Sequence, residues 1–148
     1  MDITPASSDE REWAASLLAG SNPWIRLSVS LEKCREACND PRYEVFVARD
    51  EQGPCGVILL DPRGLAGSPY VKSVAVVADR RSQGIGGALM DFAEDRCRER
   101  ARFLFLCVSS FNTRARSFYE ARGFVTVGEL PDYVVDGESE ILIQKRLR

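Results

Sequence analysis

The chain has 148 residues, 45% of them hydrophobic and 28% charged, with a formal net charge of −2. This length and balance are typical of one globular domain with a buried core, which argues against a disordered chain and against a surface charged enough to recruit nucleic acid. The absence of histidine excludes Ser-His-Asp and Cys-His catalysis, histidine-bound zinc and histidine proton shuttles.

The N-terminal segment MDITPASSDE is acidic and carries no apolar signal sequence. No stretch approaches the roughly 20 consecutive apolar residues of a membrane span, so we expect a cytoplasmic protein without a membrane partner. The chain has no C-x-x-C motif, and its cysteines are Cys34, Cys38, Cys55, Cys97 and Cys107. We expect free, mostly buried thiols and no metal site.

Hydrophobic periodicity and turn residues divide the chain into strands and helices. Ser7 and Glu10 have the spacing of a capping box, and Gly123 is typical of the position after a helix. The stretch Pro62–Pro69 predicts a longer loop, and the apolar run Phe103–Val108 predicts a central strand buried on both faces. The predicted strands are Asp2–Thr4, Glu44–Arg49, Gly56–Leu60, Tyr70–Val77, Phe103–Val108, Phe124–Gly128 and Ile141–Lys145. The predicted helices run from about Ser7 to Leu18, Ser30 to Cys38, Gly84 to Arg100 and Asn112 to Arg122.

The most informative segment is VAVVADRRSQGIGGAL, residues 74–89, in which a predicted strand leads through a polar turn into a helix. Glycines at a helix start let an anion approach the free backbone N–H groups at the positive end of the helix. A P-loop motif is absent, and Leu89 occupies the third glycine position of a dinucleotide fingerprint. The glycines alone fit a phosphate site and a tight turn without a ligand equally well.

Arg81, Gly84 and Gly86 form the pattern R-x-x-G-x-G, which resembles the pyrophosphate-binding signature of GNAT-type N-acetyltransferases. Upstream, V-x-V-x-A takes the place of the family's usual L-x-V-x-P. The resemblance implies binding of acetyl-coenzyme A (acetyl-CoA), with Arg80 as a further cation near its phosphates. The coenzyme-binding residues implied in this segment are Val74, Val76, Arg81, Ser82, Gln83, Gly84, Ile85, Gly86 and Gly87.

A second segment resembles the family independently through the pattern N-x-x-A-x-x-[FL]-Y-x-x-x-G-F. The matching residues are Asn112, Ala115, Phe118, Tyr119, Gly123 and Phe124. A helix would place Asn112 and Tyr119 on one face, about 10 Å apart, and Phe111 and Phe118 on the adjacent face, anchored in the core. The resemblance implies that Asn112 and Arg116 contact the coenzyme and that Tyr119 is the general acid near its sulfur. Taken alone, Tyr119 fits equally well as an aromatic residue at the core edge.

The resemblance also implies the fold, a single α/β domain over residues 1–148. We expect a mixed, mostly antiparallel sheet of about six or seven strands, flanked by about four helices, with splayed central strands. The strand before the turn would carry a bulge, and a free N–H near Val76 would point at the thioester oxygen. Many relatives place a catalytic glutamate where this chain has Lys72. Glu44, Asp132, Glu138 and a water relay are therefore open alternatives for the base.

The predicted function is transfer of the acetyl group of acetyl-CoA to a primary amine of a small molecule, peptide or protein. The segment Val127–Ile143 resembles a subset of bacterial GNAT proteins of unassigned substrate. We expect the acceptor near the Trp24 loop and the acidic loop Pro131–Glu138, which would suit a cationic amine. Alternatives are an acyl-CoA-binding or sensing module without catalysis and another kind of nucleotide-binding domain. A homodimer could form through the C-terminal strand and the apolar edge after Phe124.

Overall fold

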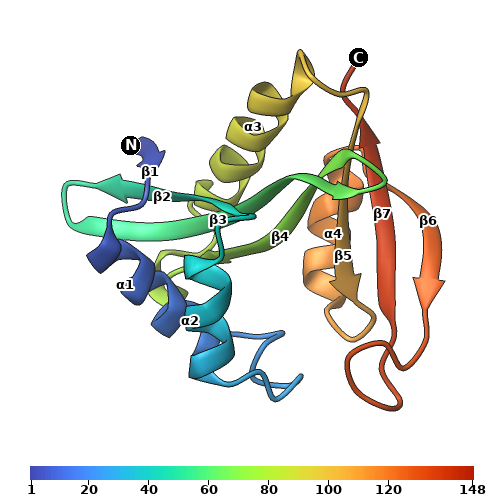
Figure 1. Ribbon diagram of the computed structural model, residues 1–148, viewed down its shortest axis with the longest axis horizontal. Helices are drawn as coiled ribbons and strands as arrows, with labels where there is room; N and C mark the ends of the chain where they lie inside the picture. The colour runs from blue at the N-terminus through green and yellow to red at the C-terminus, as the bar shows by residue number, and fades with distance from the viewer.

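The computed structural model describes residues 1–148, which form a seven-stranded sheet with helices on both faces (Figure 1). The strand order is β1-β2-β3-β4-β5-β7-β6, and all neighbouring strands are antiparallel except β4 and β5. This confirms the predicted α/β fold. The strands are β1 (Asp2–Pro5), β2 (Glu44–Asp50), β3 (Gly53–Leu65), β4 (Ser68–Val76), β5 (Phe103–Ser109), β6 (Val125–Leu130) and β7 (Glu140–Arg146). The helices are α1 (Ser8–Ala19), α2 (Leu31–Asn39), α3 (Ile85–Arg98) and α4 (Thr113–Ala121), with a short 3-10 turn at Ala78–Arg80.

The loop predicted over Pro62–Pro69 is wrong, because this segment is the tip of a hairpin. β3 continues to Leu65, which pairs with Ser68 across a two-residue turn. Both turn residues, Ala66 and Gly67, have positive φ values (51° and 83°), which gives the turn the twist of a β-hairpin. The two prolines lie where their strands have no second neighbour, so they remove no hydrogen bond to a further strand.

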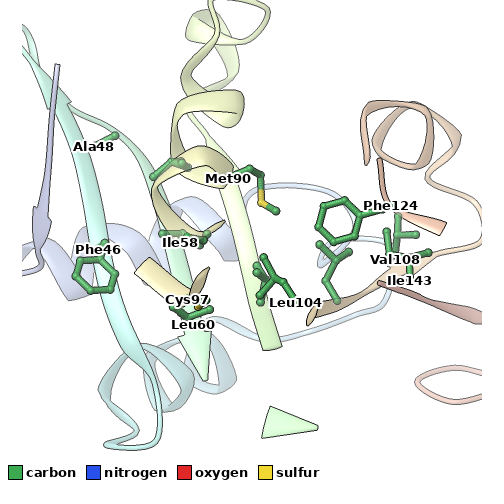
Figure 2. Packing of buried hydrophobic residues seen from close by; sticks show 14 of the residues in the cluster. Phe46, Ala48, Ile58, Leu60, Met90, Cys97, Leu104, Val108, Phe124 and Ile143 are labelled. Carbon is green, nitrogen blue, oxygen red and sulfur yellow. The ribbon is translucent and has the colours of Figure 1, made fainter. Parts of the chain in front are cut away.

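Two hydrophobic clusters fill the two faces of the sheet. The α3-side core packs α3 against β2–β5 and β7, and Figure 2 shows members such as Ile58, Leu104 and Ile143. The α1-side core packs α1 and α2 against β2, β3 and β4 only. Neither core therefore covers the α1-side face of β5, β6 and β7.

This arrangement corrects the prediction that Phe103–Val108 is buried on both faces. Leu104, Leu106 and Val108 lie in the α3-side core, whereas Phe103, Phe105 and Cys107 are only half-buried on the other face. The cause is the short α1–α2 layer, which does not extend past β4. As predicted, no cysteine is bonded to another, and all are buried except the half-buried Cys107.

The central strands β4 and β5 diverge after a short contact (Figure 1). They pair only at Tyr70↔Phe105 and Val71↔Leu106. On the other side of β4, Ser73 and Val71 pair with consecutive residues of β3, so Lys72 is the extra residue of a bulge. Both predicted features, the bulge and the splayed central strands, are therefore present.

The C-terminal strand β7 lies between β5 and β6, so the expectation that it could pair with a second chain is wrong. The free edge on that side is β6, which is the apolar edge after Phe124. Val125 and Val127 on this edge are 56% and 47% exposed.

Candidate active site

The first turn of α3 has the free N–H groups that the sequence predicted. Gly84 is the N-cap in the left-handed conformation (φ 83°), with no side-chain cap and no acidic residue in the first turn. The first intrahelical hydrogen bond is donated by Ala88 to Gly84, so the N–H groups of Ile85, Gly86 and Gly87 have no helical partner. Such a helix end is a site for an anion.

Close packing of α3 on β3 fixes the position of this helix end. A Cβ on Gly56 would lie 3.0 Å from side-chain carbons of Ile85 and Leu89 and 3.3 Å from the carbonyl oxygen of Ala75. Only glycine allows this approach without displacing the helix. Gly56 was not identified from the sequence, because it lies in an ordinary apolar strand pattern far from the turn.

The arginines of the turn differ in what they contact. Arg80 donates to Asp50, Gln52 and Gln83, so its guanidinium fixes the turn to the β2–β3 hairpin. This corrects its predicted role as a free cation for the phosphates. Arg81 is exposed and donates only to the carbonyl oxygen of Val76, at 3.3 Å. The free cation at this turn is therefore the guanidinium of Arg81, not that of Arg80.

Helix α4 adds a second arginine that the motif reading missed. Arg114 Nη2 donates to Ser82 Oγ at 3.0 Å. Arg116, the predicted contact, instead reaches Thr126 Oγ1 on β6 at 3.4 Å. The two positions are roughly 200° apart around a helix, so only one can face the turn. The spacing of four residues between Arg114 and Phe118 could have indicated that Arg114 faces the turn, because residues i and i+4 share a helix face and Phe118 lies over the same turn.

The predicted faces of α4 are exchanged in the structure. Phe118 is 37% exposed, and its Cζ lies 3.8 Å from where a Cβ on Gly86 would be. Tyr119 packs against the α3-side core, with its ring 5.6 Å from that of Phe124 in an edge-on contact. Asn112 is the N-cap, accepting a hydrogen bond from the Ala115 N–H at 3.3 Å, so it precedes the helix rather than lining a face with Tyr119.

Burial raises the pKa of the Tyr119 hydroxyl to about 12, although the positive charge of Arg122 partly opposes this rise. No hydrogen bond within the chain contributes to the shift. The phenol therefore keeps its proton at neutral pH.

Backbone geometry supports the predicted donor on β4. The Val77 N–H donates to the Cys55 carbonyl on β3 at 3.0 Å. Successive N–H groups of a strand point to opposite sides, so the Val76 N–H points away from β3, toward the side where β5 has diverged. The Val76 carbonyl also faces away from β3, where it accepts from Arg81.

The carboxylates considered as bases already have partners. Glu44 is ion-paired with Arg96 at 2.8 Å, and this pairing lowers the pKa of its carboxyl group. Glu138 is ion-paired with Arg26 at 2.7 Å. Asp132 accepts a backbone N–H within its own loop at 2.7 Å. None of these is a free carboxylate beside the divergence of β4 and β5.

Three loops meet at Arg26, which follows α1. Its guanidinium lies 4.3 Å from the ring centre of Phe111 in the β5–α4 loop and pairs with Glu138 in the β6–β7 loop. Trp24 packs on the α1-side core, and Tyr133 is 68% exposed. The loops predicted to receive an acceptor are therefore adjacent, with Arg26 joining them.

No group of three or more cysteine and acidic side chains is arranged to hold a metal ion. None of the helices combines the length and apolar character needed to cross a membrane.

Comparison with known proteins gives one family match and many fold matches. Residues 10–124 match the model of the acetyltransferase (GNAT) family. A nourseothricin acetyltransferase structure shares 29% identity over 74% of this chain and 68% of its own, with a TM-score of 0.67. An aminoglycoside 6'-N-acetyltransferase complexed with coenzyme A shares 20% identity over 100% and 98%, with a TM-score of 0.78. The ribosomal-protein-S18-alanine N-acetyltransferase from Escherichia coli shares 19% over 99% and 93%, with a TM-score of 0.77. No curated protein matches the chain significantly in sequence.

Proposed function

Because the chain belongs to the acetyltransferase (GNAT) family, we propose that it is an active N-acetyltransferase that moves the acetyl group of acetyl-CoA to a primary amine by direct attack. The observation that carries this proposal is that the anion site adjoins the end of β4. A Cβ on Gly86 would lie 3.9 Å from Val76 Cγ2, so the first turn of α3 packs against the end of β4 that carries the Val76 N–H.

The coenzyme site would be formed by the first turn of α3 and the residues around it. The N–H groups of residues 85–87 would bind the pyrophosphate, with Arg81 and Arg114 as cations beside it. Ser82, Gln83 and Gly84 shape the turn, and Val74 and Val76 would border the pantetheine arm. Asn112 contributes through its free amide N–H₂ group, because its oxygen is used as the helix cap.

The chain's own groups would then assist the reaction at the thioester, which acetyl-CoA supplies. The Val76 N–H would donate to the carbonyl oxygen as negative charge develops there. As the amine nitrogen bonds to the carbonyl carbon, the carbon–sulfur bond breaks and its electron pair passes to sulfur. Tyr119 would donate its proton to that sulfur, which releases the coenzyme as a neutral thiol.

The similar structures are named for different acceptors, which are nourseothricin, an aminoglycoside and an alanine of ribosomal protein S18. The fold alone therefore does not select the acceptor.

One observation favours a second candidate, a sensing module that binds acyl-CoA without turnover. Lys72 occupies the bulge position where many family members carry a glutamate, and its side chain is exposed. Release of free thiol from acetyl-CoA on addition of primary amines tests the choice. A transferase releases thiol in proportion to added amine, whereas a sensor binds acetyl-CoA and releases none.

A further inference from the structure

We propose that Glu140 is the catalytic base of the reaction and the anionic group that binds the acceptor, which is a primary amine carrying a positive charge at neutral pH. This inference rests on the proposed function. It assigns the base to a residue that the sequence patterns do not indicate, and it narrows the class of acceptor.

Strand register places Glu140 beside the divergence of β4 and β5. Glu140 is the first residue of β7 and pairs with Ser109, the last residue of β5. Ser109 lies three residues beyond Leu106, which pairs with Val71 on β4. Because Lys72 is the extra residue of a bulge, three ladder positions beyond Val71 lead to Ala75, just before the Val76 N–H. Glu140 therefore lies on the strand next to β5, at about the same height along the sheet as the Val76 N–H that would bind the thioester.

The side chain of Glu140 points to the face that no core covers. Ile141 belongs to the α3-side core, so its neighbour Glu140 points to the opposite side of the sheet. Lys72, the bulge residue of β4, lies near enough to Glu140 for its charge to act on that carboxyl group. The α1-side core has no member on β5 or β7, so neither hydrophobic core covers this face of the two strands.

Glu140 forms no ion pair, although the charge of Lys72 is near enough to lower the pKa of its carboxyl group. Its Oε2 accepts a hydrogen bond from Ser109 Oγ at 2.6 Å, and no arginine or lysine nitrogen forms an ion pair with it. The nearby Glu138 differs, because it is paired with Arg26. A half-buried carboxylate with one hydrogen bond gains a charge-assisted partner when an ammonium group binds.

The titratable groups that face Glu140 are Lys72 and Tyr70 from β4 and Cys107 from β5. Burial raises the pKa of the Glu140 carboxyl above its ordinary value of 4.5, while Ser109 and Lys72 oppose the rise. A raised pKa makes this carboxylate a better proton acceptor than an exposed glutamate. Tyr70 and Cys107 are themselves buried, which raises the pKa of each, so both stay neutral and leave the negative charge on Glu140.

Two hydrogen bonds hold the segment after β5 to the segment before β7. The Ser110 N–H donates to the Ser139 carbonyl at 2.8 Å, and the Ser139 N–H donates to Ser110 Oγ at 3.2 Å. These bonds join the end of β5 to the start of β7, immediately beside Ser109 and Glu140. The carboxylate is therefore carried by a paired strand rather than by a loop.

The proposed step starts from an acceptor R–NH₃⁺, which loses two protons in all. The Glu140 carboxylate takes one proton and leaves R–NH₂, whose nitrogen lone pair forms the bond to the carbonyl carbon. When the carbon–sulfur bond breaks, Tyr119 protonates the sulfur. The nitrogen then loses its second proton to the Tyr119 phenolate, and Glu140 releases the first proton to water. The products are the amide, the free thiol and one proton in solution.

The test compares Glu140→Gln with Glu12→Gln, the same change at an exposed carboxylate of α1 that is ion-paired with Arg35 and lies outside the proposed site. Thiol release from acetyl-CoA is measured with spermidine, 1,5-diaminopentane, lysine methyl ester and kanamycin, and with aniline as an amine that is uncharged at neutral pH. Binding of acetyl-CoA to each variant is measured by calorimetry. The pH profile of kcat/KM for the best amine is recorded from pH 5 to 9.

We expect a charged amine to be turned over in preference to aniline. Glu140→Gln should lower kcat/KM by about 10²-fold or more, the range of general-base catalysis, and should remove the acid limb of the pH profile. Glu12→Gln should change kcat/KM less than about threefold, because an exposed ion pair contributes little. Both variants should bind acetyl-CoA like the wild type, since neither residue touches the α3 turn.

The thermal stability of Glu140→Gln shows whether Glu140 has a structural role. The folded protein holds a proton on Glu140 more tightly than the unfolded chain does, so stability from this group falls as the pH rises through the raised pKa. Glutamine carries no charge at any pH, so Glu140→Gln should not lower Tm at pH 7.5. Lost activity with an unchanged Tm separates catalysis from a structural role.

Activity of Glu140→Gln within threefold of the wild type overturns the inference, as does preference for aniline. Absence of turnover with every amine, in a protein that binds acetyl-CoA, also overturns it and leaves the coenzyme site standing. Failure of the folded wild type to bind acetyl-CoA removes the proposed function and this inference with it.

Discussion

Arg114 donates from its Nη2 to Ser82 Oγ across 3.0 Å, and this contact joins the helix that carries Tyr119 to the turn that begins α3. In the proposed function the turn binds the pyrophosphate and the helix supplies the acid. Arg114 would therefore contact the coenzyme and also hold together the two segments that the family motifs identify.

Replacement of Arg114 by glutamine should weaken acetyl-CoA binding about tenfold. A charge-assisted hydrogen bond contributes about 1.5–3 kcal/mol, and a tenfold change in Kd corresponds to about 1.4 kcal/mol. Arg116→Gln is the matched control on the same helix and should leave Kd unchanged, because Arg116 contacts β6. Calorimetry with acetyl-CoA measures both. A larger effect at Arg116 than at Arg114 would reverse the assignment.

Replacement of Tyr119 by phenylalanine should lower kcat by about 10²-fold without loss of stability. The hydroxyl makes no hydrogen bond that stabilises the fold, while the ring that packs against Phe124 is retained. Tyr43→Phe, at a position that packs on the α1-side core away from the proposed site, serves as the control. Steady-state rates at saturating acetyl-CoA and amine decide the matter, and an unchanged kcat would remove Tyr119 from the role of acid.

Replacement of Lys72 by glutamine should move the acid limb of kcat/KM to higher pH. The positive charge of Lys72 favours the ionised form of Glu140 and so lowers its pKa. Loss of that charge raises the pKa, and more base is then protonated at any pH on the limb. The pH profiles of wild type and variant provide the measurement. A limb that stays in place or moves to lower pH contradicts the assignment of Glu140 as base.

Replacement of Gly56 by alanine should destabilise the fold by about 1–3 kcal/mol, the usual effect of overpacking. The new Cβ would lie 3.0 Å from side chains of α3 and 3.3 Å from a backbone oxygen, so the helix must move. Gly128→Ala is the matched control, since a Cβ there meets no atom within 4 Å. Urea unfolding compares the two variants. Equal stability of both would show that α3 is not held by this contact.

The sequence predicted what depends on local patterns. Ser7 and Glu10 form the capping box that their spacing indicated, and a helix begins at Gly84 as the glycine-rich turn predicted. The hairpin tip between Pro62 and Pro69 was missed, because its prolines are tolerated only by the absence of neighbouring strands, which is a property of the assembled sheet.

Features that depend on long-range packing could not be predicted. A helix pattern does not say which face meets the core, so Phe118 and Tyr119 were exchanged. The importance of Glu140 depends on β7 lying next to β5, and a single sequence gives no signal for that pairing. The same limit applied to Gly56, whose partner helix begins many residues later in the chain.

The most direct test of the central claim is calorimetric titration of acetyl-CoA into the wild type and into Gly86→Glu. A Cβ at residue 86 would meet Phe118 and Val76 only at 3.8 and 3.9 Å, so the fold should tolerate the substitution, while the carboxylate would lie near the N–H groups proposed for the pyrophosphate. We predict micromolar binding to the wild type and a loss of about 100-fold or more in the variant, since a negative charge there opposes a negative ligand. Equal affinity in the folded variant, or no binding to the folded wild type, would contradict the account.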